Sequence, residues 1–345
     1  FKNIIALTRS IMLDLRYIRE NSETVKENIK KKFQDDKLLL VDELLKEDEQ
    51  YRQLLKQSEE LRAKRNKLSE AINKTKKEGG DIQPILNEAK EIPDKIKQIE
   101  EEQDKIKSSI LKKQMQIPNM MHESVPLGKD DTENVERETF GEIPKPSFEI
   151  KNHAEIAEQL NIADFESSRE TSGQGFFFLK GDLAALEEAL RQYAIDFMRK
   201  KGYTFITPPN LIRSDIVKGV MSFAEMEAMM YKIEGEDLFT IGTSEHSLIG
   251  MFNGKTLKKE ALPIKIFANT TCYRKEVGSH GIDEKGLFRV HQFNKVEQII
   301  LCEPEDSYKL YDELLQNTVE LFKALKLPVR ILECCSGDLD RKSVV

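Results

Sequence analysis

The stretch Tyr273–Glu297 has the sequence YRKEVGSHGIDEKGLFRVHQFNKVE, which predicts two β-strands joined by a glycine-bearing loop. Side chains alternate between the two faces of a regular strand, so the first strand should present Arg274 and Glu276 together. The loop glycines are Gly278, Gly281 and Gly286. The second strand, if regular, places on one face Arg289, His291, Phe293, Lys295 and Glu297.

The residue types on this surface suit a nucleotide bound beside an amine. Arginine is a permanently charged, planar donor that matches phosphate oxygens. A phenylalanine ring can stack on a base, and a carboxylate can hold an ammonium group. The set therefore fits a nucleoside triphosphate lying next to an amino group. A solvated hairpin with ordinary surface charges is the alternative that these residues alone leave open.

The composition limits the class of protein. With 345 residues, the chain is long enough for two domains and a sizeable core. The net charge of −7 argues against a generally basic nucleic-acid-binding protein, although local basic stripes remain possible. No apolar run approaches the length of a membrane span, so no membrane partner is expected. The four cysteines form no CxxC pair and no zinc-type spacing, which predicts a reduced, cytosolic (cytoplasmic) protein without zinc.

Heptad patterns in the first part of the chain predict a long helical hairpin. Residues 38–76 have a helical pattern, Gly79 and Gly80 then reverse the chain, and a second helix returns. The first helix would be about 60 Å long, so the hairpin should project into solvent. Pro93 should kink the returning helix or delay its regular part. The seam of the returning helix, with one polar insertion, is Ile85, Ala89, Ile92, Ile96, Ile99, Gln103, Ile106 and Ile110.

Basic clusters lie along this predicted arm. Clustered lysines and arginines at helical spacing are what binding to a phosphate backbone requires. A solvated coiled coil, in which lysine and glutamate mix routinely, is the alternative. The candidate nucleic-acid-binding residues are Lys64, Arg65, Lys67 and Lys74.

The remainder of the chain predicts a proline-rich linker followed by an α+β domain on a mainly antiparallel sheet flanked by helices. Its strongest helix covers Leu183–Lys201, with Asp182 as the N-cap, and a strand at Tyr203–Thr207 follows. We expect an upstream extension, an N-terminal domain with its arm, a linker and a larger domain. Their respective residues are 1–11, 12–117 with the arm at about 38–113, 118–150 and 151–345.

The ordered series of motifs resembles the seryl-tRNA synthetases, class II aminoacyl-tRNA synthetases, in their widespread non-zinc form. The opening stretch resembles motif 2 of that class, and Leu183–Lys201 with the following strand and Pro209 resembles motif 1, the dimer-interface element. The other matching segments are Met12–Arg19, the helical arm, Ile117–Asn119, His122–Pro126, Phe178–Leu183 and Thr243–Glu245.

The resemblance implies roles for particular residues. The expected catalytic residues are Arg274, Glu276 and Arg289, with Arg274 on the α-phosphate of ATP. Serine would be bound by Thr243, Ser244, Glu245 and Glu297. ATP would be bound by Arg274, Lys275, Glu276, Arg289, Val290 and Phe293.

The resemblance also implies the reaction and its partners. L-serine and ATP, with Mg²⁺, would form seryl-adenylate, and serine would pass to the 3′ end of tRNA(Ser) and also of tRNA(Sec). The helical arm would grip the long variable arm of the tRNA. A homodimer would form through the motif 1 region around Pro209.

The sequence leaves two other functions open. One is an amino acid:carrier-protein ligase on the same fold, although such relatives lack the arm. The other is a catalytically impaired paralogue or fragment that binds tRNA through the arm. The third class II motif would follow the last residues of the sequence, so we expect a chain truncated before motif 3 and of little activity.

Overall fold

The computed structural model describes residues 4–6, 13–217, 219, 223–276 and 286–339. These residues divide into two compact units. One contains residues 13–137 with 332–339, and the other contains the described part of 138–331 with 4–6. Each unit has a hydrophobic core of its own.

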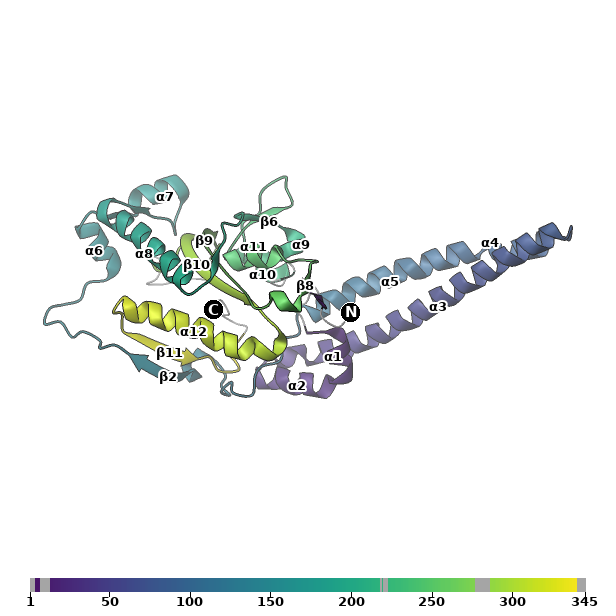
Figure 1. Ribbon diagram of the computed structural model, residues 1–345, viewed down its shortest axis with the longest axis horizontal. Helices are drawn as coiled ribbons and strands as arrows, with labels where there is room; N and C mark the ends of the chain where they lie inside the picture. Colours follow the sequence, from purple (N-terminus) through teal and green to yellow (C-terminus); the bar gives the residue numbers. More distant parts are fainter. Residues whose placement is uncertain (1–3, 7–12, 218, 220–222, 277–285, 340–345) are drawn as a thin grey trace. The chain divides into compact units, whose positions relative to one another are not determined.

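The arm is a pair of antiparallel helical segments, as predicted. Helix α3 (Leu38–Lys77) packs along α4 (Gln83–Lys90) and α5 (Ile92–Gln114) (Figure 1). All eight seam positions of the returning segment, from Ile85 to Ile110, are buried or partly buried. Pro93 is the second residue of α5, just after the break between the two helices. The proline therefore delays the regular helix, because its missing N–H is harmless in a first helical turn.

The one polar seam residue has a partner across the arm. Gln103 Nε2 donates to Ser58 Oγ at 3.3 Å, and Ser58 Oγ donates to the carbonyl of Leu55 at 3.0 Å. Ser58 is only 1 % exposed. A buried polar pair of this kind favours one alignment of two helices over shifted ones.

Short helices pack against the base of the arm. They are α1 (Leu15–Glu20) and α2 (Ser22–Lys31), and the side chain of Asp14 caps α1 by accepting from the backbone N–H of Arg16 and Tyr17. The shared core consists of Ile18, Val25, Ile29, Val41, Leu44, Ile110 and Ile117.

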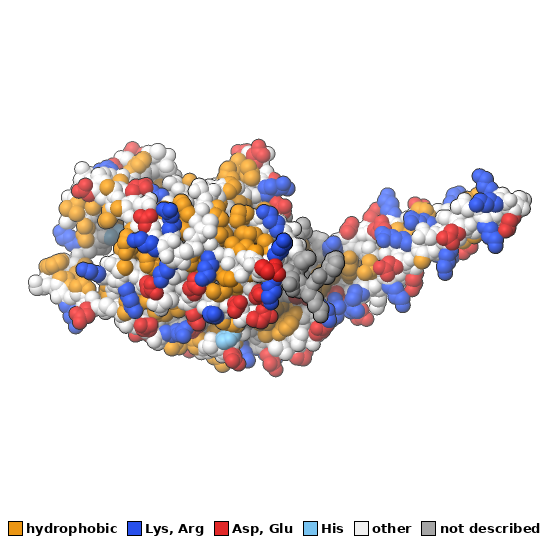
Figure 2. Space-filling view, viewed as in Figure 1, with side chains coloured by type: hydrophobic (Ala, Val, Ile, Leu, Met, Phe, Trp, Pro, Cys, Tyr) orange, Lys and Arg blue, Asp and Glu red, His pale blue; other side chains and the backbone are white. Residues whose placement is uncertain are grey.

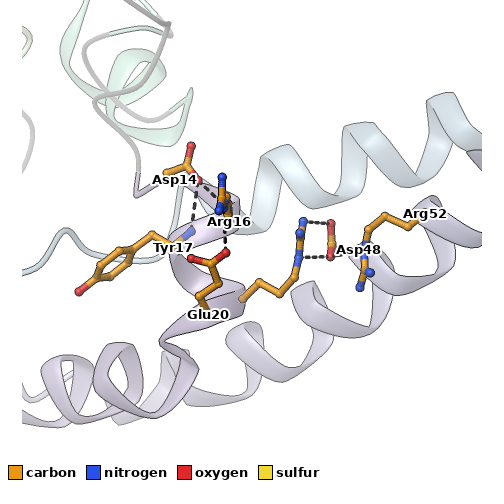
Figure 3. A network of polar contacts seen from close by, with 7 residues as sticks. Asp14, Arg16, Tyr17, Glu20, Asp48 and Arg52 are labelled. Carbon is orange, nitrogen blue, oxygen red and sulfur yellow. Dashed lines mark hydrogen bonds and ion pairs between the residues drawn. The ribbon is translucent and has the colours of Figure 1, made fainter.

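A charged network also joins α1 to α3 (Figure 3). The buried carboxylate of Asp48 accepts from Arg19 at both oxygens, with Nε–Oδ2 at 2.8 Å and Nη2–Oδ1 at 3.0 Å. Arg52, one turn along α3, donates to the same Oδ2 at 3.0 Å. Two guanidinium groups thus compensate one buried carboxylate, as a charge removed from water requires.

The second unit is built on a three-stranded sheet of order β10-β9-β5. Strands β9 (Ile264–Tyr273) and β10 (Gln292–Leu301) are antiparallel over ten paired residues, whereas β5 (Thr204–Phe205) runs parallel to β9. On one face Phe267 packs with residues of α8 (Gly181–Lys200) and α12 (Ser307–Ala324). On the other face Ile266 and Ala268 pack against Leu248 of α11 (Ser244–Gly250).

The smaller sheets have two strands each, and three of them are antiparallel: β1–β8, β3–β4 and β6–β7. The fourth is β2–β11. The predicted α+β fold with a helical arm and mainly antiparallel strands is confirmed. The remaining α-helices and β-strands are β1 (Ile4–Ala6), β2 (Val135–Phe140), α6 (His153–Gln159), β3 (Ala163–Asp164), α7 (Glu166–Ser172), β4 (Phe178–Leu179), β6 (Leu211–Arg213), α9 (Ser214–Val217), α10 (Phe223–Met229), β7 (Leu238–Thr240), β8 (Thr256–Lys258) and β11 (Val329–Glu333).

The predicted N-cap of α8 is wrong. The helix begins at Gly181, its N-cap residue is the extended Lys180, and no side chain caps it. Asp182 lies inside the first turn, where its negative charge still interacts favourably with the helix dipole. Within the described residues, no helix combines the length and the apolar character needed to cross a bilayer.

Candidate active site

The hairpin forms as predicted, but its two strands are shorter than the predicted alternation of side chains needs. β9 ends at Tyr273 and β10 begins at Gln292, so Arg274, Glu276, Arg289 and His291 lie outside them. Glu276 has a φ of +44°, which ends the extended conformation after β9. The predicted shared face is correct for Phe293, Lys295 and Glu297, and the alternation does not extend beyond β10. Gly278 and Gly281 lie outside the described residues.

Arg274 and Phe293 come together at the end of the hairpin. The Arg274 guanidinium carbon lies 5.1 Å from the centroid of the Phe293 ring. Its Nε donates to the carbonyl of Gly242 at 3.1 Å, and its backbone N–H donates to the carbonyl of His291 at 3.0 Å. A cation beside an aromatic face is a favourable arrangement, and here it places a side chain of a kind that can bind phosphate next to a ring of a kind that can stack on a base.

The other predicted ATP-binding residues differ in their contacts and in their burial. Arg289 Nε is 2.9 Å from Glu276 Oε2, so these two candidates form an ion pair with each other. Val290 is buried. Lys275 is tied to the end of α10, since its Nζ donates to the carbonyl of Glu227 at 2.9 Å.

The predicted serine-binding residues meet at the start of α11. Thr243 is the N-cap, accepting from the N–H of Glu245 at 3.3 Å, and its hydroxyl donates to Glu297 Oε2 at 2.9 Å. Burial raises the pKa of the Glu245 carboxyl, Glu297 raises it further, and Lys295 lowers it. Ser244 is fully buried, and its hydroxyl has no hydrogen-bond partner among the described residues. The structure therefore brings Thr243, Glu245 and Glu297 together.

Two histidines near the site were not assigned from the sequence. His246 is 3 % exposed, and its pKa is lowered to about 4 by burial and then by Lys295 and Arg274. It is therefore a neutral ring at physiological pH. His291 stacks on Phe176 with centroids 5.4 Å apart, and its Nδ1 lies 2.8 Å from the hydroxyl of Tyr231. The local sequence carries no signal for these contacts, because Phe176 and Tyr231 are distant in the chain.

The C-terminal end of the hairpin loop is attached to α6. The backbone N–H of Leu287 donates to His153 Nε2 at 2.9 Å. Gly286, at φ +131°, approaches the same ring so closely that a Cβ would overlap His153 Nε2. Only glycine fits there, which gives Gly286 a specific role.

The candidate tRNA-binding residues Lys64, Arg65, Lys67 and Lys74 are all exposed on α3. Lys64 Nζ lies 2.7 Å from Glu88 Oε1 on α4. Lysine and arginine side chains alternate with acidic ones along the arm, so it is not uniformly basic (Figure 2). In the described part of the chain, no group of three or more His, Cys, Asp or Glu residues could hold a metal ion.

Comparison with known proteins identifies the family. Residues 12–121 match the seryl-tRNA synthetase N-terminal domain, and residues 229–343 match the tRNA synthetase class II core domain (G, H, P, S and T). The serine–tRNA ligase of Methanocella arvoryzae is 42 % identical over 328 residues, which cover 95 % of this chain and 77 % of that protein.

Solved structures agree in fold. Seryl-tRNA synthetase from Pyrococcus horikoshii, complexed with ATP, has a TM-score of 0.87 and 36 % identity, covering 95 % of this chain and 78 % of that one. Cytoplasmic serine–tRNA ligase from Naegleria fowleri, in complex with AMP, has a TM-score of 0.79 and 28 % identity, covering 95 % and 79 %. The chain belongs to the seryl-tRNA synthetase family of class II aminoacyl-tRNA synthetases.

Proposed function

We propose that this chain activates serine with ATP at the site formed by β9, β10 and α11, as the first step of its serine–tRNA ligase activity. The ligase activity follows from the family, and the proposal concerns the residues that perform it. One observation carries it: Phe293 and Glu297 lie on the same face of β10, four residues apart. That spacing is about 13 Å along a strand, which leaves room for the ribose, phosphate and carbonyl between a base and an amine.

The nucleotide would lie at the Arg274–Phe293 end. The relatives from P. horikoshii and N. fowleri are complexed with ATP and AMP, which supports a nucleotide at this site. Adenine would stack on Phe293 while Arg274 binds the α-phosphate. Arg289 would exchange its ion pair with Glu276 for the outer phosphates. Val290 and Lys275 complete the proposed ATP contacts.

The chemistry requires little of the protein beyond positioning and charge. An oxygen of the serine carboxylate attacks the α-phosphorus, the bond to the β-phosphate oxygen breaks, and pyrophosphate leaves. The carboxylate is already an anion, so no strong general base is needed. Arg274 would stabilise the charge that develops on the phosphate. Mg²⁺ would come with the ATP phosphates and neutralise them, since it commonly binds through substrate phosphates and few protein ligands.

Serine would be recognised at the other end. Glu297 would bind the α-ammonium, while Thr243, Ser244 and Glu245 would complete the pocket. If alanine bound in place of serine, the protein groups that hydrogen-bond the serine hydroxyl would be left unpaired. Such a pocket therefore rejects alanine as a substrate.

Replacing Glu297 with Gln tests the assignment of the ammonium site. The ligands are a seryl-adenylate analogue, with a sulfamoyl group in place of the phosphate, and its counterpart that lacks the amino group. Isothermal titration calorimetry should show that the unsubstituted chain prefers the amino form by about 30-fold, the value of one charge-assisted hydrogen bond. Glu297→Gln should remove most of this preference, whereas the control Glu305→Gln should retain it. Equal binding of both ligands by the unsubstituted chain would refute the assignment.

The arm would supply the tRNA contacts. We retain Lys64, Arg65, Lys67 and Lys74 as the proposed contacts to the phosphate backbone of the long variable arm. Charging of tRNA(Sec) and a cytoplasmic location likewise remain predictions. We also retain the domain division predicted from the sequence. It consists of an N-terminal domain with an arm (12–117), a linker (118–150) and a catalytic domain (from 151).

A homodimer would form through the motif 1 region. One face of α8 exposes Leu186, Leu190 and Tyr193, at 61 %, 47 % and 42 %, with the spacing of a single helical stripe. The double variant Leu186→Asp/Leu190→Asp should convert a dimer into a monomer in sedimentation equilibrium, because two carboxylates cannot be buried there without partners. Leu39→Asp, which changes an exposed leucine of α3, should leave the dimer intact. A monomeric unsubstituted chain would contradict the proposal.

A further inference from the structure

The proposed ammonium site already holds a cation from the protein itself. Lys295 Nζ forms an ion pair with Glu297 Oε2, the same oxygen that accepts from the Thr243 hydroxyl at 2.9 Å. Both side chains are largely withdrawn from solvent, with exposed fractions of 26 % for Lys295 and 19 % for Glu297. An ion pair in such a position is shielded less by water than one on the open surface.

Strand geometry places this lysine inside the site. Lys295 lies between Phe293 and Glu297 on one face of β10, opposite Thr270 of β9. A substrate with its base on Phe293 and its amine on Glu297 would have its carboxyl and phosphate groups between the two. The Lys295 ammonium can therefore lie only beside the amine of the bound substrate or beside the carboxyl and phosphate groups in its middle.

The charges around Glu297 are unevenly matched. Two carboxylates, Glu245 and Glu297, interact with one another and with Lys295. The Glu245 carboxyl responds to both neighbours, since Glu297 raises its pKa and Lys295 lowers it. The α-ammonium of an amino acid that takes the place of Lys295 at Glu297 would meet the same two carboxylates.

We propose that Lys295 is the resident counterion of Glu297 and that the α-ammonium of the substrate displaces it, which makes Lys295 a positioning and specificity residue. The inference rests on the proposed assignment of Glu297 to the ammonium. An entering amine has to replace the ion pair between Lys295 and Glu297. An amine that binds Glu297 only weakly is therefore disfavoured. The displaced Lys295 then faces the carboxyl and phosphate groups, and only a ligand with an amine and an anion at this spacing uses both partners.

The test combines a protein variant with a change in the ligand. Lys295→Met removes the ammonium while keeping a linear side chain, and Lys295→Gln is a second neutral variant should the first not fold. The seryl-adenylate analogue and its counterpart without the amino group are titrated calorimetrically against each protein. Dividing the two affinities cancels the effect of Lys295 on the carbonyl and sulfamoyl groups, because both ligands carry these groups.

The preference for the amino form should rise about tenfold in Lys295→Met, since one like charge no longer competes for Glu297. Lys295→Arg, which keeps the charge, should stay near the original preference. The same is expected of Lys309→Met, which removes the charge of an exposed lysine of α12. An unchanged or smaller preference in both neutral variants would overturn the proposal. If the unsubstituted chain shows no preference for the amino ligand, the assignment of Glu297 fails instead.

Discussion

Reversing the charge of three arm residues, Lys64→Glu, Arg65→Glu and Lys67→Glu, is expected to weaken binding of a tRNA with a long variable arm about 1000-fold. Each phosphate contact that is lost lowers by about one the number of counterions that tRNA binding releases. Three lost contacts therefore account for a loss of affinity of this size at moderate salt. Fluorescence anisotropy at several salt concentrations measures both the affinity and its salt dependence. The slope of log affinity against log salt should become shallower by about two to three.

The three exposed residues lie on α3, and one of them is also an intramolecular partner. Lys64→Glu breaks its ion pair with Glu88, so a changed arm could be mistaken for lost tRNA contacts. The swap Lys64→Glu with Glu88→Lys restores the pair, and circular dichroism should then show an unchanged helix content. A tRNA without a long variable arm is the ligand control, whose binding should change little. Similar losses for both tRNAs would contradict recognition of the variable arm.

Replacing Arg274 with Ala is expected to lower the affinity for a non-hydrolysable ATP analogue by about 100- to 1000-fold. The change removes a forked, charge-assisted contact to phosphate, and each such hydrogen bond contributes about 1.5–3 kcal/mol. It also removes the cation beside Phe293 and the hydrogen bond to Gly242, which hold the guanidinium in place. Calorimetric titration of the analogue provides the measurement.

Arg274→Lys separates charge from geometry. Lysine keeps the positive charge but lacks the planar fork, so its affinity should lie between those of the unsubstituted chain and Arg274→Ala. Arg213→Ala removes a mostly exposed arginine of β6 and serves as the control. If Arg274→Ala binds the analogue within threefold of the unsubstituted chain, Arg274 does not contact the phosphates.

The arm could be predicted almost completely because its information is local. A heptad pattern specifies which positions meet, and all eight positions that it selects on the returning segment are buried or partly buried. Pro93 and the two glycines mark the helix ends through backbone restrictions within a single turn. The N-cap of α8 shows the limit of such local rules. Asp182 has suitable chemistry for capping, yet the extended backbone of Lys180 starts the helix earlier.

The active site could be predicted only as a set of residue types. Alternation on β10 correctly grouped Phe293, Lys295 and Glu297, because a strand has a period of two. The same alternation placed Arg289 and His291 within the strand, whereas β10 begins at Gln292. An observed strand end depends on which backbone groups find partners in β9, and that pairing is non-local.

The sequence by itself determined the arm, the hairpin and the identity of the charged and aromatic side chains. Only the tertiary structure decided which partner each charged group has: Thr243 and Lys295 for Glu297, Glu276 for Arg289, and the Phe293 ring for Arg274. The reason is physical. Helical periodicity and strand alternation act over a few residues. Polar contacts in the site depend instead on register between strands and on burial against α11, which bring together residues more than fifty positions apart, such as Thr243 and Glu297.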